Sequence, residues 1–167
     1  MLAHPSAPKQ EPIRLHKRAL MIIHVPADLK EISRLGRKYP WKRPDNCQHC
    51  GSVVWGHGYR ELLFEGYNDP IPIKRWRCPM CQCVIVCRPA GYFNRFQTPI
   101  QTIRWTISYR LQTDHWPSGV SRTRCGHWLR ALKRRTLAYL GNTWQSSLVN
   151  AFDLFVWQGQ VPVSRSI

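Results

Sequence analysis

Four of the seven cysteines form two CxxC pairs, Cys47–Cys50 and Cys78–Cys81. Each pair can turn both thiolates toward one cation, and two pairs complete the tetrahedral four-sulfur shell that Zn²⁺ prefers at structural sites. Residues 51–77 separate the pairs, a longer gap than the roughly 15 to 20 residues of the common template. A long hairpin accommodates this gap, because closing a longer loop costs little more free energy. We therefore predict one structural zinc ion (Zn²⁺).

Two other interpretations of the paired cysteines remain open. A CxxC pair can be a redox dithiol, but this requires a thioredoxin-like βαβ context that the surrounding pattern lacks. Cysteine can also serve as a small buried hydrophobic residue. If the zinc interpretation holds, four thiolates leave no open coordination position, so the site stabilises the fold and does not perform catalysis.

The other candidate ligands have weaker patterns. His49 lies between the first two thiols, where a side chain is more often exposed than bound to the metal. Cys83 and Cys87 share one side of an expected strand but stand roughly 13 Å apart, too far for a disulfide. We expect these two cysteines to pack as apolar residues, and Cys125 to lie in a helical core.

The charge of the chain indicates its partners. Lys and Arg number 25 against 9 Asp and Glu, which gives a formal net charge of +16. Such an excess attracts a polyanion, most often nucleic acid, although a basic surface can also be merely solvated. No apolar run approaches the roughly 20 residues needed to span a bilayer. We expect no membrane partner and a cytoplasmic, nucleoid-associated protein.

The second half of the chain has a helical pattern. Thr98 is the expected N-cap of a first helix, with Pro99 at its first position and Gln101 closing a capping box. A stop near Asp114 and a glycine turn precede Ser121, the expected cap of a second helix. The apolar stripe of that second helix comprises Cys125, Trp128 or Leu129, and Leu132.

This order of helix, glycine turn and basic helix is the layout of a helix-turn-helix. In that motif the start of the second helix meets base edges, so Arg122 and Arg124 are the predicted readers of sequence. Phosphate contacts are expected from four residues further along: Arg130, Lys133, Arg134 and Arg135. The alternative is a basic helix face that is only solvated.

The remaining segments complete an α+β prediction, in which a small zinc-ribbon sheet is followed by a helix-turn-helix-like part. We expect a buried strand over Leu20–Val25, a helix over Pro26–Leu35 ended by Gly36, and strands at Val53–Trp55 and Ile71–Arg77. A last helix over Thr143–Trp157 presents Trp144, Leu148, Phe152 and Phe155 to the core or to a dimer partner. The predicted divisions are a basic arm (1–18), a lead-in (19–44), a zinc ribbon (45–97), a helical part (98–158) and a tail (159–167).

Three motifs in the ribbon region resemble the zinc ribbon of bacterial transposase-related proteins. They are Cys47–Ser52 (CQHCGS), Trp55–Arg60 (WGHGYR) and Arg75–Cys81 (RWRCPMC). The stretch from Gly119 to Leu129 is similar to the helix-turn-helix that follows this ribbon, so the likeness covers roughly residues 45 to 135. The chain departs from the family pattern at Asn46, Gln82 and Cys83, none of which is a predicted ligand.

The resemblance implies a mobile-element protein that recognises element ends or an operator in double-stranded DNA. A full transposase of this kind continues into a catalytic domain with a carboxylate cluster, which needs on the order of 100 residues. The acidic residues here are scattered, so we expect a non-enzymatic protein that works as a homodimer or beside a separate transposase subunit.

Another class of function is an RNA-binding or ribosome-associated zinc protein. Aromatic residues Trp41, Trp55, Tyr59 and Trp76 alternate with basic ones in the ribbon region, a pattern that can stack unpaired bases. The basic residues of the strand concerned are Lys74, Arg75 and Arg77. These three residues form the second group of candidate nucleic-acid contacts. A third class of function is an enzyme fragment that needs a catalytic partner.

Overall fold

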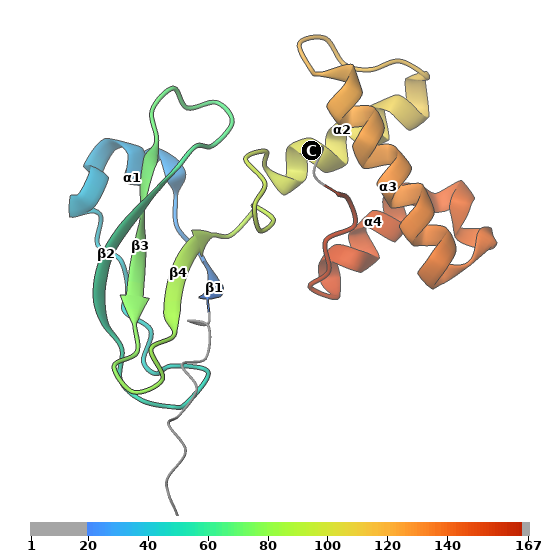
Figure 1. Cartoon of the computed structure of the whole chain (residues 1–167). Helices are drawn as coiled ribbons and strands as arrows, with labels where there is room; N and C mark the ends of the chain where they lie inside the picture. Colours follow the sequence, from blue (N-terminus) through green and yellow to red (C-terminus); the bar gives the residue numbers. More distant parts are fainter. Residues whose placement is uncertain (1–19, 165–167) are drawn as a thin grey trace, which may run out of the picture.

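Four strands form one mixed sheet in the computed structural model, which describes residues 20–164 (Figure 1). The predicted arm, residues 1–18, and the last residues of the predicted tail, 165–167, lie outside the described residues. The strands are β1 (Leu20–Val25), β2 (Trp55–Leu62), β3 (Ile71–Arg77) and β4 (Val84–Pro89). They are ordered β1-β4-β3-β2, with β1 parallel to β4 and the other pairs antiparallel.

Two of these strands begin and end at the predicted residues, and two predictions need correction. The prediction of a buried β1 is wrong: among the described residues it is an edge strand that pairs with β4 alone, and Leu20 is 57% exposed. Of the predicted strand Val53–Trp55, only Trp55 belongs to β2. Val54 comes before the strand, because it is fully buried and packs beside the cysteines.

One short helix, α1 (Leu29–Leu35), packs its buried Leu29 and Ile32 against Ile71 and Ile73 of the sheet. Asp28 caps α1 by accepting a hydrogen bond from the backbone N–H of Lys30 at 2.9 Å. Gly36 ends the helix, as predicted, with a φ of 58° that a residue without a Cβ adopts at little cost. The predicted lead-in and ribbon therefore share one unit, which we call the sheet lobe (residues 20–89).

The second unit is the helical lobe (residues 100–164), joined to the sheet lobe by residues 90–99 (Figure 1). It contains α2 (Ile100–Thr113), α3 (Arg122–Leu140) and α4 (Leu148–Trp157), with a 3-10 helix, η2 (Asn142–Ser147), before α4. Its core is built from Ile103, Ile107, Cys125, Trp128, Leu132, Leu148, Phe152 and Phe155. In the part of the chain that the structure covers, no helix combines the length and apolar character needed to cross a bilayer.

The cap predicted for α2 is wrong, whereas the cap predicted for α3 is confirmed. The N-cap of α2 is Pro99, and Thr98 instead donates its hydroxyl to Glu65 of the sheet lobe. No side-chain bond closes a capping box with Gln101. Ser121 does cap α3, because its hydroxyl accepts a hydrogen bond from the backbone N–H of Arg124 at 3.4 Å.

The predicted last helix is divided in two. Residues 142–147 take the tighter 3-10 form, and α4 begins only at Leu148. Gly141, with a φ of 87°, separates α3 from this segment. The core role predicted for this segment is confirmed, because Leu148, Phe152 and Phe155 are buried and Trp144 packs against them.

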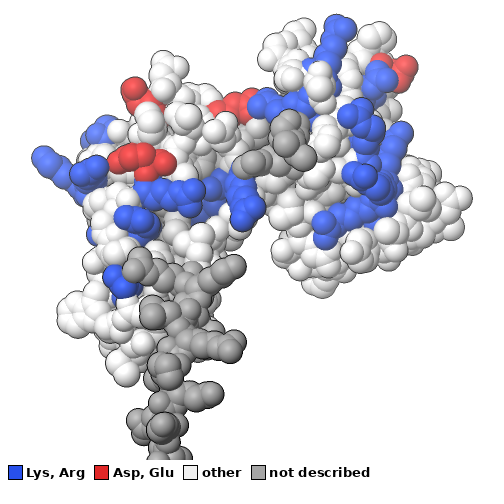
Figure 2. All heavy atoms as spheres, viewed as in Figure 1, with Lys and Arg blue, Asp and Glu red and all other residues white. Residues whose placement is uncertain are grey.

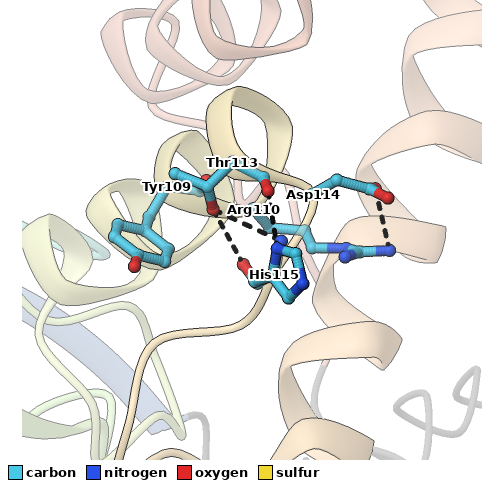
Figure 3. A network of polar contacts seen from close by, with 5 residues as sticks. All are labelled: Tyr109, Arg110, Thr113, Asp114 and His115. Carbon is cyan, nitrogen blue, oxygen red and sulfur yellow. Dashed lines mark hydrogen bonds and ion pairs between the residues drawn. The ribbon is translucent and has the colours of Figure 1, made fainter.

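A local polar network ends α2 (Figure 3). Asp114 adopts the left-handed conformation, with a φ of 59°, and pairs with Arg110 at 3.2 Å. The hydroxyl of Thr113 donates to the carbonyl oxygen of Tyr109 at 2.8 Å, and a ring nitrogen of His115 lies 2.7 Å from the carbonyl oxygen of Thr113. These contacts fix where the chain leaves α2 and turns toward α3.

Candidate metal centre and basic surfaces

The two CxxC pairs form matching turns, one before β2 and one between β3 and β4. In the first turn the backbone N–H of Gly51 donates to the carbonyl of Cys47 at 2.7 Å. In the second turn the N–H of Gln82 donates to the carbonyl of Cys78 at 3.1 Å. Gly51 and Gln82 each follow the second cysteine of their pair, and both have a positive φ, 75° and 61°. The same backbone geometry thus presents both pairs of thiols.

These turns bring four sulfur atoms together. The ligand atoms of Cys47, Cys50, Cys78 and Cys81 all lie within 4.8 Å of one another. Sulfur atoms are 3.6 Å apart in Cys47–Cys81 and 3.4 Å apart in Cys50–Cys78. A tetrahedral zinc ion with Zn–S bonds of about 2.3 Å places its sulfurs about 3.8 Å apart. The cluster can therefore hold one metal ion, and both its donor set and its size fit zinc.

The four thiols also alter one another's acidity. Hydrogen bonds from the side chain and backbone of Ser52, followed by one from Cys78, lower the pKa of Cys50 to about 6. For Cys81, a backbone hydrogen bond from Cys83 lowers the pKa, but burial and the neighbouring thiols outweigh it and raise the value to about 12. One thiol of the group therefore ionises readily while another holds its proton. A bound cation would displace that proton, because zinc binds the thiolate form.

The other cysteines lie outside this cluster. Cys83 and Cys87 are both fully buried, so the predicted apolar packing is confirmed, and Cys87 accepts a hydrogen bond from the indole N–H of Trp76 at 3.2 Å. Burial raises the pKa of both thiols. His49 is exposed and does not belong to the cluster. Cys125 lies in the helical core, as expected.

The six predicted contact residues of α3 fall on two faces of the helix. At about 100° per residue, four of them cover one arc of about 120°. These four are exposed, and none has a carboxylate partner within the described residues; they are Arg122, Arg130, Lys133 and Arg134. We call them the basic face of α3. Arg124 and Arg135 lie beside the buried stripe instead.

Arg124 and Arg135 both make contacts within the protein. Arg124 pairs with Glu65 of the sheet lobe at 3.0 Å, and its guanidinium lies 5.1 Å from the ring centre of Trp128. Arg135 stacks on Tyr139 and Phe155, with distances to the ring centres of 5.5 and 5.7 Å, and donates to Gln160. Arg124 and Arg135, which were predicted to contact nucleic acid together with the four residues of the basic face, therefore pack within the protein.

The predicted contacts of β3 have mixed surroundings. The Lys74 ammonium lies 4.5 Å from the ring centre of Tyr59 and 5.1 Å from that of Trp76, a cation–π arrangement. Arg77 donates to the side chain of Gln82, next to the second CxxC turn. Arg75 is half-buried, on the opposite face of the strand from Lys74. Trp55, at the start of β2, is 61% exposed.

Basic side chains dominate one view of the molecule. Figure 2 shows Lys and Arg atoms gathered in a band across the sheet lobe and in a row on the helical lobe, with smaller groups of acidic atoms beside the band and where the lobes meet. A further basic group was not predicted from the sequence, because Arg60, Arg88 and Arg95 come from three separate segments that line one cavity. The sequence feature that could have indicated this group is Arg88, a charged residue that directly follows the apolar run Val84–Cys87.

Comparisons of the chain with protein family models, with curated proteins and with solved structures find no match.

Proposed function

We propose that this protein is a zinc-dependent DNA-binding protein related to transposases, which recognises mobile-element ends or an operator in duplex DNA. The observation that carries this proposal is the basic face of α3. Its four cationic side chains are exposed and have no carboxylate partner in residues 20–164. Cations that are not neutralised within the protein remain available for phosphates, and their counterions are released on binding.

In this proposal α3 enters the major groove and α2 supports it from behind. Arg122 is in the first turn of α3, the end that reaches base edges in helix-turn-helix proteins. The connection between the helices spans residues 114–121, longer than the three or four residues of the standard motif. The proposal therefore rests on the exposed cations of α3 rather than on the form of the turn.

Zinc has a structural role in this proposal. The cluster lies at the ends of β2, β3 and β4, so a bound ion joins the segments that precede and connect these strands. The sheet lobe has two small core clusters, and a bound metal would add its binding free energy to the folding free energy that these supply. The protein would act as a homodimer or beside a separate transposase subunit, and any catalytic step would come from that separate subunit.

RNA binding is the second candidate, and β3 supports it. Lys74 lies against the rings of Tyr59 and Trp76, and Trp55 is exposed on the neighbouring strand. Trp55 is the exposed ring of this group and can stack an unpaired base, whereas Trp76 is only 8% exposed and packs in the core beside the cysteines. Competition between duplex DNA and single-stranded RNA of equal length separates the two candidates, because preferential retention of the duplex contradicts the RNA candidate.

The first prediction concerns salt. If the basic face and its neighbours make six or more phosphate contacts, duplex affinity should fall by about 10³ between 50 and 200 mM salt. Fluorescence anisotropy with a labelled duplex measures this slope. An affinity that does not change with salt would contradict the use of these cations for phosphate contact.

The second prediction compares the two ends of the basic face. Arg122→Ala should weaken binding to the preferred site by roughly 1 to 3 kcal/mol and relax the choice of one base pair. Arg134→Ala should weaken binding to all sequences alike and reduce the salt slope by about one unit. Selection from a randomised duplex library measures both effects, and equal behaviour of the two variants would argue against α3 as a reader of sequence.

A further inference from the structure

A cavity of about 650 Å³ lies on the sheet lobe, away from the metal centre and from the basic face of α3. Three arginines line it: Arg60 of β2, Arg88 of β4 and Arg95 of the segment that joins the lobes. Asn94 and Gln97 also line the cavity, as do apolar residues of the two edge strands, β1 and β2. The volume falls in the range of about 300 to 1,000 Å³ that is typical of small-molecule sites.

Arg88 is the unusual member of this group. It is only 6% exposed, its guanidinium lies 5.4 Å from the ring centre of Phe64, and it donates to the backbone carbonyl of Phe96. Its Nε atom is buried without a hydrogen-bond partner. Burial lowers the pKa of Arg88, and the positive charge of the nearby Arg60 lowers it further. A buried cation beside a second cation is unfavourable unless an anion joins them.

The described residues supply no such anion. No carboxylate from residues 20–164 forms an ion pair with Arg60, Arg88 or Arg95. Arg95 also has a left-handed backbone, with a φ of 67°, which is costly for a residue with a Cβ. Backbone strain of this type tends to occur at ligand sites. Here it accompanies a side chain on the wall of the cavity.

We propose that this cavity binds the phosphate group of a nucleotide, either free or at the end of a nucleic-acid strand. Guanidinium groups present paired N–H donors that match the oxygens of a phosphate. Arg60, Arg88 and Arg95 bind the phosphate, and the apolar residues of β1 that line the cavity next to β4, Leu20 and Ile22, receive the sugar and base. This inference does not depend on the proposed binding of duplex DNA by α3.

Isothermal titration of the full zinc-loaded chain with inorganic phosphate tests the proposal. We expect one saturable site, and Arg60→Gln and Arg95→Gly should each weaken it about tenfold, the loss of one charge-assisted hydrogen bond. Both residues are exposed, and glycine suits the backbone of residue 95, so these variants should fold. Arg34→Gln removes an equal charge from α1, outside the cavity, and should leave the phosphate affinity unchanged.

Two further ligands identify the source of the phosphate. The site binds a strand end if a 5′-phosphorylated oligonucleotide binds more tightly than a 5′-mononucleotide and more tightly than the same oligonucleotide with a 5′-hydroxyl group. The site binds a free nucleotide if the mononucleotide binds as tightly as the phosphorylated oligonucleotide. Absence of saturable phosphate binding, equal binding of acetate, or an equal loss in Arg34→Gln would overturn the proposal. Phosphate binding that persists in Arg122→Ala separates this site from the proposed duplex surface.

Discussion

Each CxxC turn depends on the residue that follows its second cysteine. Gly51 takes the required left-handed backbone without a Cβ, whereas Gln82 takes the same conformation at a cost of about 1 to 2 kcal/mol. The side chain of Gln82 offsets this cost, because its amide donates to the carbonyl of Pro79 at 2.6 Å and its oxygen accepts from Arg77. The departure at Gln82 from the ribbon pattern thus leaves the geometry of the cysteines intact.

The metal prediction can be tested one residue at a time. Cys47→Ser or Cys78→Ser should lose the metal and leave the sheet lobe largely unfolded, because the site loses a ligand and the connection it makes between strands. Elemental analysis of the purified chain should give one zinc per molecule for the unsubstituted protein. Circular dichroism follows the accompanying loss of structure.

Cys83→Ser is the matched control for this experiment. Cys83 is as buried as Cys78 and adjacent to the second turn, but its thiol is outside the cluster. The control variant should therefore keep its zinc even if it loses some stability. Loss of zinc from Cys83→Ser with retention in Cys78→Ser would show that the fourth ligand is wrongly assigned.

At the scale of the element, α3 uses its basic residues in two ways. Those on the exposed arc pair with no carboxylate among the described residues, while Arg124 and Arg135 cover the edge of the buried stripe. Their long aliphatic stems shield apolar surface, and their guanidinium groups lie against aromatic rings. Two adjacent arginines, Arg134 and Arg135, therefore have different surroundings on the same helix.

This difference leads to a prediction about stability. Arg135→Ala should lower the free energy of unfolding by about 1 to 2 kcal/mol, because it removes the contacts with Tyr139 and Phe155. Arg134→Ala removes the same charge one residue away and should change it by less than about 0.5 kcal/mol. Urea unfolding followed by tryptophan fluorescence measures both, and equal stability of the two variants would contradict a packing role for Arg135.

The elements that follow from local patterns were predictable. The bounds of β1 and β3, the cap of α3 and its buried stripe depend on spacing within a short stretch of sequence. The four-cysteine cluster was predictable because each CxxC pair is itself a local pattern, although residues 51–77 separate the two pairs. The cap of α2 was not predictable, because Thr98 bonds to Glu65 from another part of the chain. The arginine cavity escaped prediction for the same reason: Arg60, Arg88 and Arg95 meet only after the sheet has formed.

At the scale of the whole molecule, Glu65 connects the two lobes. It lies between β2 and β3, its backbone N–H donates to the carbonyl of Gln97 at 2.9 Å, and its carboxylate accepts from Thr98 and Arg124. The pair with Arg124 holds the start of α3 against the sheet lobe. The pair also neutralises Arg124, which was predicted to contact bases but does not belong to the basic face. Binding of DNA by Arg124 would therefore require this ion pair to break.

Glu65→Gln should therefore strengthen duplex binding. The substitution keeps the shape of the side chain but removes the charge that competes with DNA for Arg124, and a pair this exposed contributes less than about 1 kcal/mol. We expect the affinity to rise about threefold to fivefold at 100 mM salt, with a steeper salt dependence because one more cation reaches the duplex.

Glu61→Gln is the matched control, since it removes an equal charge from β2 and releases Arg37 rather than Arg124. Fluorescence anisotropy of both variants on one duplex decides the question. An equal gain in the two variants would mean that only net charge matters, and a loss in Glu65→Gln would mean that the bridge positions α3 for binding instead of restraining Arg124.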